Sequence, residues 1–168
     1  MAELTPSERL QPCLLDRLTD DEPQSAVESR DKRVFSVRQL REAVLRDVAW
    51  LLNAPNKERT GEYEEFPLAR ASVLNFGLPD LTGLTASAVE SGELESLVRE
   101  AIERFEPRIL PGSLRVRFLS PDDQGGYNTL GLEIAGDMWA QPVPEQLFLK
   151  TEVDLETGQC SLTEAPHG

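Results

Sequence analysis

The stretch that decides the fold is SGELESLVREAIERFEPRILPGSLRVRF, residues 91–118, because its apolar period changes there from helical to extended. Ser91 is predicted as the N-cap of a helix, and the acidic Glu93 and Glu95 in the first turn suit the positive end of the helix dipole. Pro107 ends the helix, since the residue before a proline is pushed out of the helical conformation. The predicted buried stripe consists of Leu94, Leu97, Val98, Ala101, Ile102 and Phe105.

A period of two begins in residues 114–118, where apolar side chains alternate with arginines. This alternation is typical of a strand with one buried face. The same pattern at 129–134 and 147–155 predicts two more strands, and 160–162 suits a short fourth strand. Strands that follow one another at short spacing favour an antiparallel meander. We therefore predict an α+β fold in which two or three helices cover one face of a small antiparallel sheet.

A second helix is predicted at residues 36–53. Ser36 and Gln39 have the types and spacing of a capping box, and apolar residues follow at helical spacing. The opposite face is predicted to be solvated, and it carries Arg38, Arg41, Glu42, Arg46 and Asp47.

Residues 1–33 are predicted to form an arm with a short amphipathic helix. Its four leucines share one helical face: Leu10, Leu14, Leu15 and Leu18. They must dock either on their own domain or on a partner, and the sequence leaves both open. Residues 34–162 are predicted as a single domain and 163–168 as a flexible tail.

Two connecting segments are predicted from their turn-forming residues. Residues 54–65 are polar and indicate a loop, whereas 72–80 indicate a turn that carries apolar side chains and packs as a corner. In that turn, Asn75 and Asp80 are predicted as turn-formers. Core or half-buried packing is predicted for the two tryptophans, Trp50 and Trp139.

The charge of the chain disfavours several classes of partner. With 17 basic and 30 acidic residues among 168, the formal net charge is -13, which repels nucleic acids and anionic lipid. No apolar run is long enough to span a membrane, and the sequence MAELTPSERL has neither the basic start nor the apolar stretch of a secretory signal. We therefore expect a cytoplasmic protein, in which Cys13 and Cys160 are free thiols.

Catalytic chemistry has weak support. A hydrolase would need a pair of carboxylates, and the best single candidate is Glu106, at a helix end beside Phe105. Arg108, two residues on, is expected to hold Glu106 ionised, which is the wrong state for an acid catalyst. The single histidine, His167, is penultimate in the chain, and no nucleotide-binding loop or serine-hydrolase elbow occurs.

The junction FEPR at 105–108 has two interpretations. In the first, Glu106 and Arg108 only brace the corner between helix and sheet. In the second, proline presents the carboxylate and the guanidinium at a fixed angle as an anchor for a partner. The sequence alone leaves both open.

Five segments occur in a distinctive order along residues 10–160: LLDRL at 14–18, residues 36–53 with the ending RDVAWLLN, SVLNFGLPD at 72–80, FEPR at 105–108 and VDLETG at 153–158. Together they resemble the TssE family, the baseplate wedge subunits of type VI secretion systems, which are similar to a small wedge protein of contractile phage tails. The family motif Glu-Pro-Arg is matched without substitution by Glu106, Pro107 and Arg108. Phe76 stands where relatives often have tyrosine.

The resemblance implies a non-enzymatic assembly protein without catalytic residues, cofactor or metal. It implies a wedge built with TssF, TssG and TssK around the spike hub VgrG, recruited to the cytoplasmic face of the inner membrane. It also implies that Glu106, Pro107 and Arg108 contact the contractile sheath subunits TssB and TssC and help to start sheath assembly. Addition of a strand to an open sheet edge is a physical route for such a contact.

A short isolated helix is marginal in water, so we predict that the arm docks on a wedge partner through Leu14, Leu15, Asp16, Arg17 and Leu18. Two alternatives remain. The family is also labelled lysozyme-like, which would predict a peptidoglycan hydrolase, although the residues above disfavour that activity. The other alternative is an adaptor that acts through the leucine arm alone.

Overall fold

The computed structural model describes residues 12–19, 23–24, 35–57, 60–82, 91–119, 129–140 and 143–165. Leu10 and His167, considered above, lie outside these residues. Two long helices are described, α2 (Val37–Asn53) and α4 (Ser91–Phe105), together with the short helices α1 (Leu14–Leu18) and α3 (Pro67–Arg70). Two 3₁₀ turns, η4 (Val73–Asn75) and η5 (Pro111–Ser113), complete the helical part.

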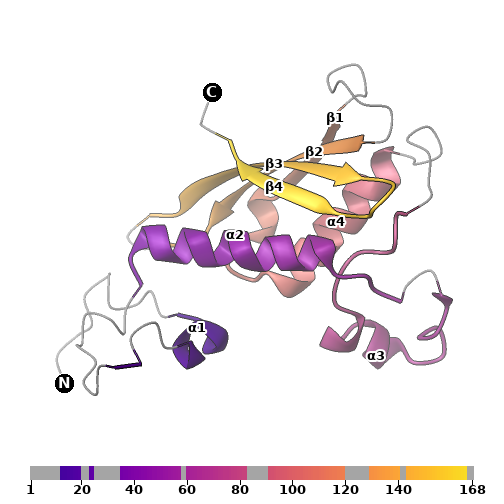
Figure 1. The fold of residues 1–168 in the computed structure, drawn as a ribbon, viewed down its shortest axis with the longest axis horizontal. Helices are drawn as coiled ribbons and strands as arrows, with labels where there is room; N and C mark the ends of the chain where they lie inside the picture. The colour runs from indigo at the N-terminus through magenta and orange to yellow at the C-terminus, as the bar shows by residue number, and fades with distance from the viewer. Residues whose placement is uncertain are drawn as a thin grey trace.

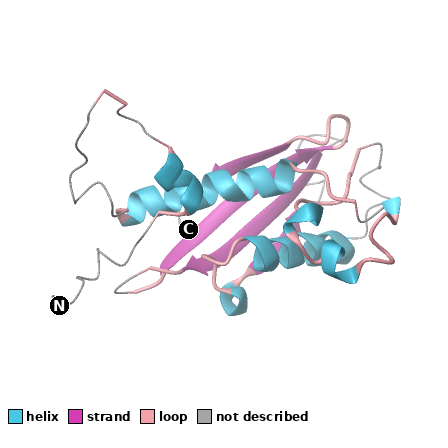
Figure 2. Ribbon diagram, turned by 90° about the horizontal axis from the view of Figure 1, so that it is seen from below, coloured by secondary structure: helices cyan, strands magenta, loops and turns pink. Residues whose placement is uncertain are grey.

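The strands form one antiparallel meander within the described residues. They are β1 (Arg115–Leu119), β2 (Thr129–Met138), β3 (Glu145–Asp154) and β4 (Cys160–Glu164), hydrogen-bonded in the order β1-β2-β3-β4. Figures 1 and 2 show α2 and α4 side by side on one face of this sheet. The predicted α+β fold is thus confirmed. The last strand extends to Glu164, two residues into the segment predicted as a tail.

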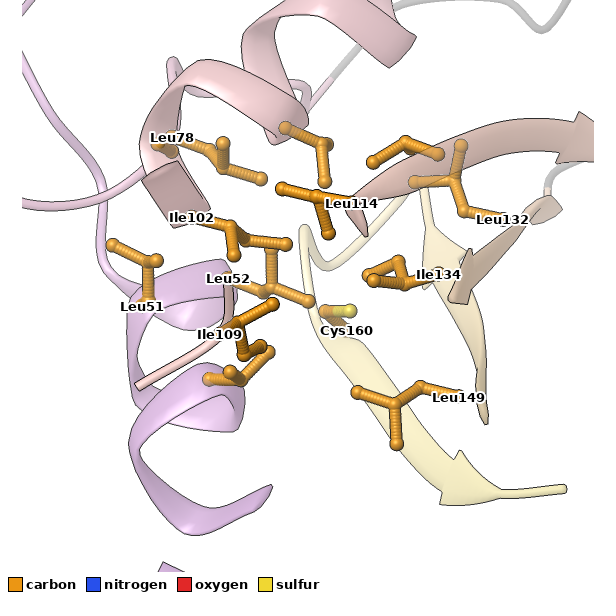
Figure 3. Packing of buried hydrophobic residues seen from close by; sticks show 14 of the residues in the cluster. Leu51, Leu52, Leu78, Ile102, Ile109, Leu114, Leu132, Ile134, Leu149 and Cys160 are labelled. Carbon is orange, nitrogen blue, oxygen red and sulfur yellow. The ribbon is translucent and has the colours of Figure 1, made fainter. Parts of the chain in front are cut away.

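Alternation of side chains places the core between the sheet and the helices. In β3, Leu147, Leu149, Thr151 and Val153 are buried, while their neighbours in the strand are exposed. The buried Thr151 satisfies its hydroxyl by donating to the carbonyl of Leu132 at 3.2 Å. Figure 3 shows how Leu52 from α2, Ile102 from α4 and strand residues such as Ile134 converge.

Helix side chains cover the backbone at both edges of the sheet. At β1, the carboxylate of Glu95 in α4 accepts the N–H of Phe118 at 2.8 Å. At β4, the amide of Asn53 in α2 binds both backbone groups of Cys160. A strand added to either edge must therefore displace one of these side chains at that position.

The local predictions hold best where the pattern is periodic. The capping box of Ser36 and Gln39 is present at the start of α2, as predicted. Ser91 is the first residue of α4 rather than its cap, and α4 ends before Pro107 as predicted. Neither tryptophan lies in the core: Trp50 is 53% exposed and Trp139 is 41% exposed.

The apolar corner predicted at residues 72–80 is only partly present, since Leu78 is buried whereas Val73 and Leu74 are exposed, and residues 66–71 before it carried no prediction. Residues 66–75 include α3 and η4, and four of their large apolar side chains are exposed: Phe66, Leu68, Val73 and Leu74. Only Asn75 of η4 is buried; its Oδ1 accepts the N–H of Lys57 at 2.9 Å, and its amide donates to the carbonyl of Arg70 at 3.2 Å. Asp80 accepts the N–H of Thr82 at 2.9 Å, so it is a turn-former as predicted, whereas the side chain of Asn75 instead joins two separate segments.

Candidate functional site

The FEPR junction is a tight turn fixed to the sheet. The N–H of Glu106 donates to Ile102 at 2.8 Å and closes the last turn of α4. After Pro107, the chain runs along the end of β2: the N–H of Trp139 donates to the Arg108 carbonyl at 2.6 Å, and Ile109 bridges Met138. We call Glu106, Pro107 and Arg108 the corner.

Within the corner, Arg108 binds Glu106 through two parallel contacts. Nε donates to Oε1 at 2.7 Å and Nη2 donates to Oε2 at 2.5 Å, while the Arg108 N–H also donates to Oε1 at 3.1 Å. The Glu106 side chain is only 3% exposed. Because both of its oxygens accept hydrogen bonds from Arg108, Glu106 is not arranged as a proton donor to a substrate.

The corner is one end of a chain of alternating charges. Arg108 Nη2 also donates to Oδ2 of Asp47 in α2 at 2.5 Å. The other oxygen of Asp47 accepts from Nε of Arg46 at 2.8 Å, and Nη1 of Arg46 donates to Asp16 in α1 at 2.6 Å. We call these five residues the charge relay: Asp16, Arg46, Asp47, Arg108 and Glu106.

The relay contradicts the prediction that Arg46 and Asp47 lie on a merely solvated face. Both are half-buried, and each contacts a partner from another segment. Three carboxylates and two guanidiniums thus alternate across three parts of the chain. Such charge-assisted contacts are stronger than neutral hydrogen bonds, and their geometry is specific.

Burial and ion pairing have opposite effects on the pKa values of Arg108 and Asp16. Burial by itself lowers the pKa of Arg108, but the hydrogen bonds and charges of Glu106 and Asp47 outweigh it, so that pKa is raised. Burial by itself raises the pKa of Asp16, yet its hydrogen bonds with Arg46 and Cys13 and the charge of Arg46 leave that pKa below its usual value. At neutral pH, Asp16 and Arg108 are therefore both charged.

A groove of about 500 Å³ runs between α1 and the corner. Cys13 and Leu15 line it on the arm side, Phe105 and Pro107 line it on the corner side, and Trp50 contributes from α2. The guanidinium of Arg46 lies 5.1 Å from the centre of the Trp50 ring, which suits a cation–π contact. The groove is thus largely apolar and bordered by the relay.

The arm residues predicted to contact a wedge partner do not all face solvent. Leu14 and Leu18 are 71% and 74% exposed, and Arg17 is exposed as well. Asp16 instead faces the protein body and binds Arg46. Asp16 therefore attaches the arm to its own domain, whereas Leu14, Leu15 and Leu18 are exposed in the described structure, and their docking on a partner stays a prediction.

Sequence reasoning missed two features of this surface. The relay joins residues up to 92 positions apart, from Asp16 to Arg108, and no local pattern indicates such pairing. Val73 and Leu74 of η4 belong to a segment that was predicted to pack as a corner, whereas no prediction covered the exposed Phe66 and Leu68 before it. Their one sequence signal is a high apolar content without helical or strand periodicity.

The described part of the chain holds no candidate metal site, no candidate membrane span and no disulfide. No three His, Cys, Asp or Glu side chains there are arranged to hold a metal ion. None of the described helices is long and apolar enough to cross a membrane. Both Cys13 and Cys160 are free thiols.

The sequence of this chain matches the model of one known protein family. A family model described as "Baseplate wedge protein gp25" matches residues 38–143, which include all but the first residue of α2, the corner, β1 and β2. No curated protein and no solved structure matches the chain. TssE belongs to the matched family, so the resemblance found in the sequence is confirmed. Because the match covers more than half of the chain, this protein belongs to the gp25 family of baseplate wedge proteins.

Proposed function

We propose that this protein is a structural baseplate subunit of a type VI secretion machine, which joins the wedge complex to the contractile sheath and helps to initiate sheath assembly. Membership of the gp25 family supports a structural role in a phage-tail-like baseplate. The observation that carries the proposed contact with the sheath is the corner. There Pro107 is exposed, and Arg108 is fixed by Glu106 and Asp47. A rigid charged corner beside an apolar groove suits recognition of a protein surface.

The proposed partners divide over two surfaces. Glu106, Pro107 and Arg108 are proposed to contact the sheath subunits TssB and TssC. The arm is proposed to contact TssF, TssG or TssK through Leu14, Leu15 and Leu18, near the spike hub VgrG. This assembly would place the protein at the cytoplasmic face of the inner membrane.

Exposed apolar side chains support an assembly role in general. Large uncovered apolar surfaces mark sites of protein interaction. In addition to the arm leucines, residues 66–74 expose four such side chains: Phe66, Leu68, Val73 and Leu74. We propose no enzymatic role, because the best carboxylate candidate, Glu106, is buried and bound through both oxygens.

Sheath assembly in cells, followed with a fluorescent sheath subunit, tests the corner. Arg108→Ala is expected to abolish sheath structures while the purified variant keeps the wild-type circular dichroism spectrum. The matched control is Arg38→Ala, which removes an arginine whose ion pair with Glu42 lies at the exposed surface of α2. Normal sheaths in cells with Arg108→Ala would mean that the corner only ends α4 and does not contact the sheath.

A second variant covers the case in which Arg108→Ala fails to fold. Pro107→Glu adds a charge to the exposed tip of the corner and leaves every residue of the relay in place. Loss of sheaths with this folded variant supports contact at the corner. Sheaths of normal number and length with Pro107→Glu would place the contact elsewhere.

A further inference from the structure

Arg46 and Asp47, adjacent in α2, connect the arm to the corner. Asp47 divides its carboxylate between two guanidiniums, with Oδ1 toward Arg46 and Oδ2 toward Arg108. Arg46 in turn binds Asp16 of the arm. We propose that Arg46 and Asp47 are positioning residues, which couple the docking of α1 to the orientation of Arg108.

The coupling follows from the alternation of charge. With Asp16 in place, Arg46 is shared between two carboxylates, and Asp47 gives one oxygen to Arg46 and the other to Arg108. Without Asp16, Arg46 is balanced by Asp47 alone and competes more strongly with Arg108 for it, so that Arg108 keeps Glu106 but holds Asp47 less firmly. In a partly desolvated network this competition acts at short range and is little screened by salt.

The groove gives the coupling a structural consequence. Cys13 and Leu15 form its wall on the arm side, and Pro107 and Arg108 form part of the opposite wall. The position of α1 therefore sets the shape of the surface beside the corner. A partner on one wall would therefore change the surface that the other wall offers, so the two proposed contact surfaces form one linked unit. The biological use of this unit rests on the proposed function, whereas the coupling is a property of the isolated chain.

Backbone amides at the two ends report the coupling separately. At the corner, the N–H of Ile109 donates to Glu106 at 3.1 Å and the N–H of Trp139 donates to Arg108. In the arm, the N–H of Arg17 donates to Cys13 at 3.1 Å and the N–H of Thr19 donates to Leu15 at 3.0 Å. Amide hydrogen exchange of the full chain, resolved by NMR, follows all four.

The first experiment changes the arm and measures the corner. Asp16→Asn keeps the size of the side chain and removes its charge. We expect exchange at Ile109 and Trp139 to become faster by about threefold or more, which lies within the range for residues coupled in one ion-pair network. Arg17→Gln, which removes a charge from the exposed side of the same short helix, is expected to leave both corner amides unchanged.

The second experiment changes the middle of the relay. Asp47→Asn is expected to speed exchange at both ends, since the amide cannot hold two guanidiniums as a carboxylate does. If that variant fails to fold, Arg46→Lys serves instead, because it keeps the positive charge but loses the fork that reaches Asp16 and Asp47 together. Amides of the buried strand residues Leu149 and Val153 give the reference for global opening.

Two results would overturn the coupling. One is that Asp16→Asn speeds exchange of the arm amides only, with Ile109 and Trp139 unchanged. The other is an equal acceleration of the corner and β3 amides, which means loss of overall stability. The measurement needs no partner, so it is independent of sheath assembly: coupling in the isolated chain with normal sheaths in Arg108→Ala cells would overturn the proposed function alone.

Discussion

Asn53, the last residue of α2, binds both backbone groups of Cys160 at the start of β4. Its Nδ2 donates to the Cys160 carbonyl and its Oδ1 accepts the Cys160 N–H, each at 2.9 Å. The side-chain amide thus takes the place that a neighbouring strand would occupy. It also fixes the end of α2 to the outer strand, 107 positions away in the chain.

Replacing Asn53 is expected to destabilise the fold. Asn53→Ala leaves the N–H and carbonyl of Cys160 without these partners, and we expect a loss of about 1–3 kcal/mol in the free energy of unfolding. Urea denaturation followed by circular dichroism measures it. A control is Glu42→Ala on the exposed face of α2, expected to change stability by less than about 0.5 kcal/mol. Equal stability of the Asn53 variant and wild type would mean that water replaces both contacts at no net cost.

Gly77 is expected to tolerate no side chain. Its φ of +117° lies outside the range of other residues, and a Cβ there would lie 1.9 Å from the carbonyl oxygen of Ala54. Gly77→Ala is therefore expected to cost more than about 3 kcal/mol, because the backbone of two paired segments must separate. Thermal unfolding measures the loss. Gly92→Ala in α4, where the added Cβ meets nothing within 4 Å, is expected to leave the protein as stable or slightly more stable. Similar melting temperatures for the two variants would contradict this reading of Gly77.

The sequence predicted those elements whose signals are local. The capping box of Ser36 and Gln39 and the apolar stripe behind it fix the start and the buried face of α2, and alternation fixes the strands. Both patterns arise because burial repeats with the period of the backbone itself. The segment with α3 was missed because its apolar residues face solvent and leave no periodic signal.

The candidate site was predicted only in part, for a related reason. The pairing of Glu106 with Arg108 spans two residues and follows from their types and spacing. The contacts of Arg46 with Asp16 and of Arg108 with Asp47 depend on how α1, α2 and the corner are placed in space. A charged residue on an amphipathic helix gives no sign of whether it meets solvent or a distant partner. That is why Arg46 and Asp47 were wrongly predicted as solvated.

The arm is expected to loosen in acid. Pairing with Arg46 leaves the pKa of Asp16 below its usual value, so this carboxylate stabilises the fold above the unfolded pKa of about 3.9. The contribution falls as the pH drops through the lower pKa of the folded state. The difference in unfolding free energy between wild type and Asp16→Asn is therefore expected to be largest near pH 7 and to shrink below about pH 4. Urea titrations over that range measure it, and a difference independent of pH would contradict the role given to the Asp16 charge.

The two thiols are expected to react at very different rates. Burial raises the pKa of Cys160 to about 11, and its side chain packs against the core beside Val153, its pairing partner in β3. Cys13 is half-buried at the rim of the groove. Titration with a coloured disulfide reagent at pH 8 is therefore expected to show one fast thiol in the wild type and none in Cys13→Ser. In urea, Cys13→Ser is expected to regain one reactive thiol, because unfolding exposes Cys160. A fast thiol in folded Cys13→Ser would mean that the junction between Asn53 and β4 opens readily in the native state.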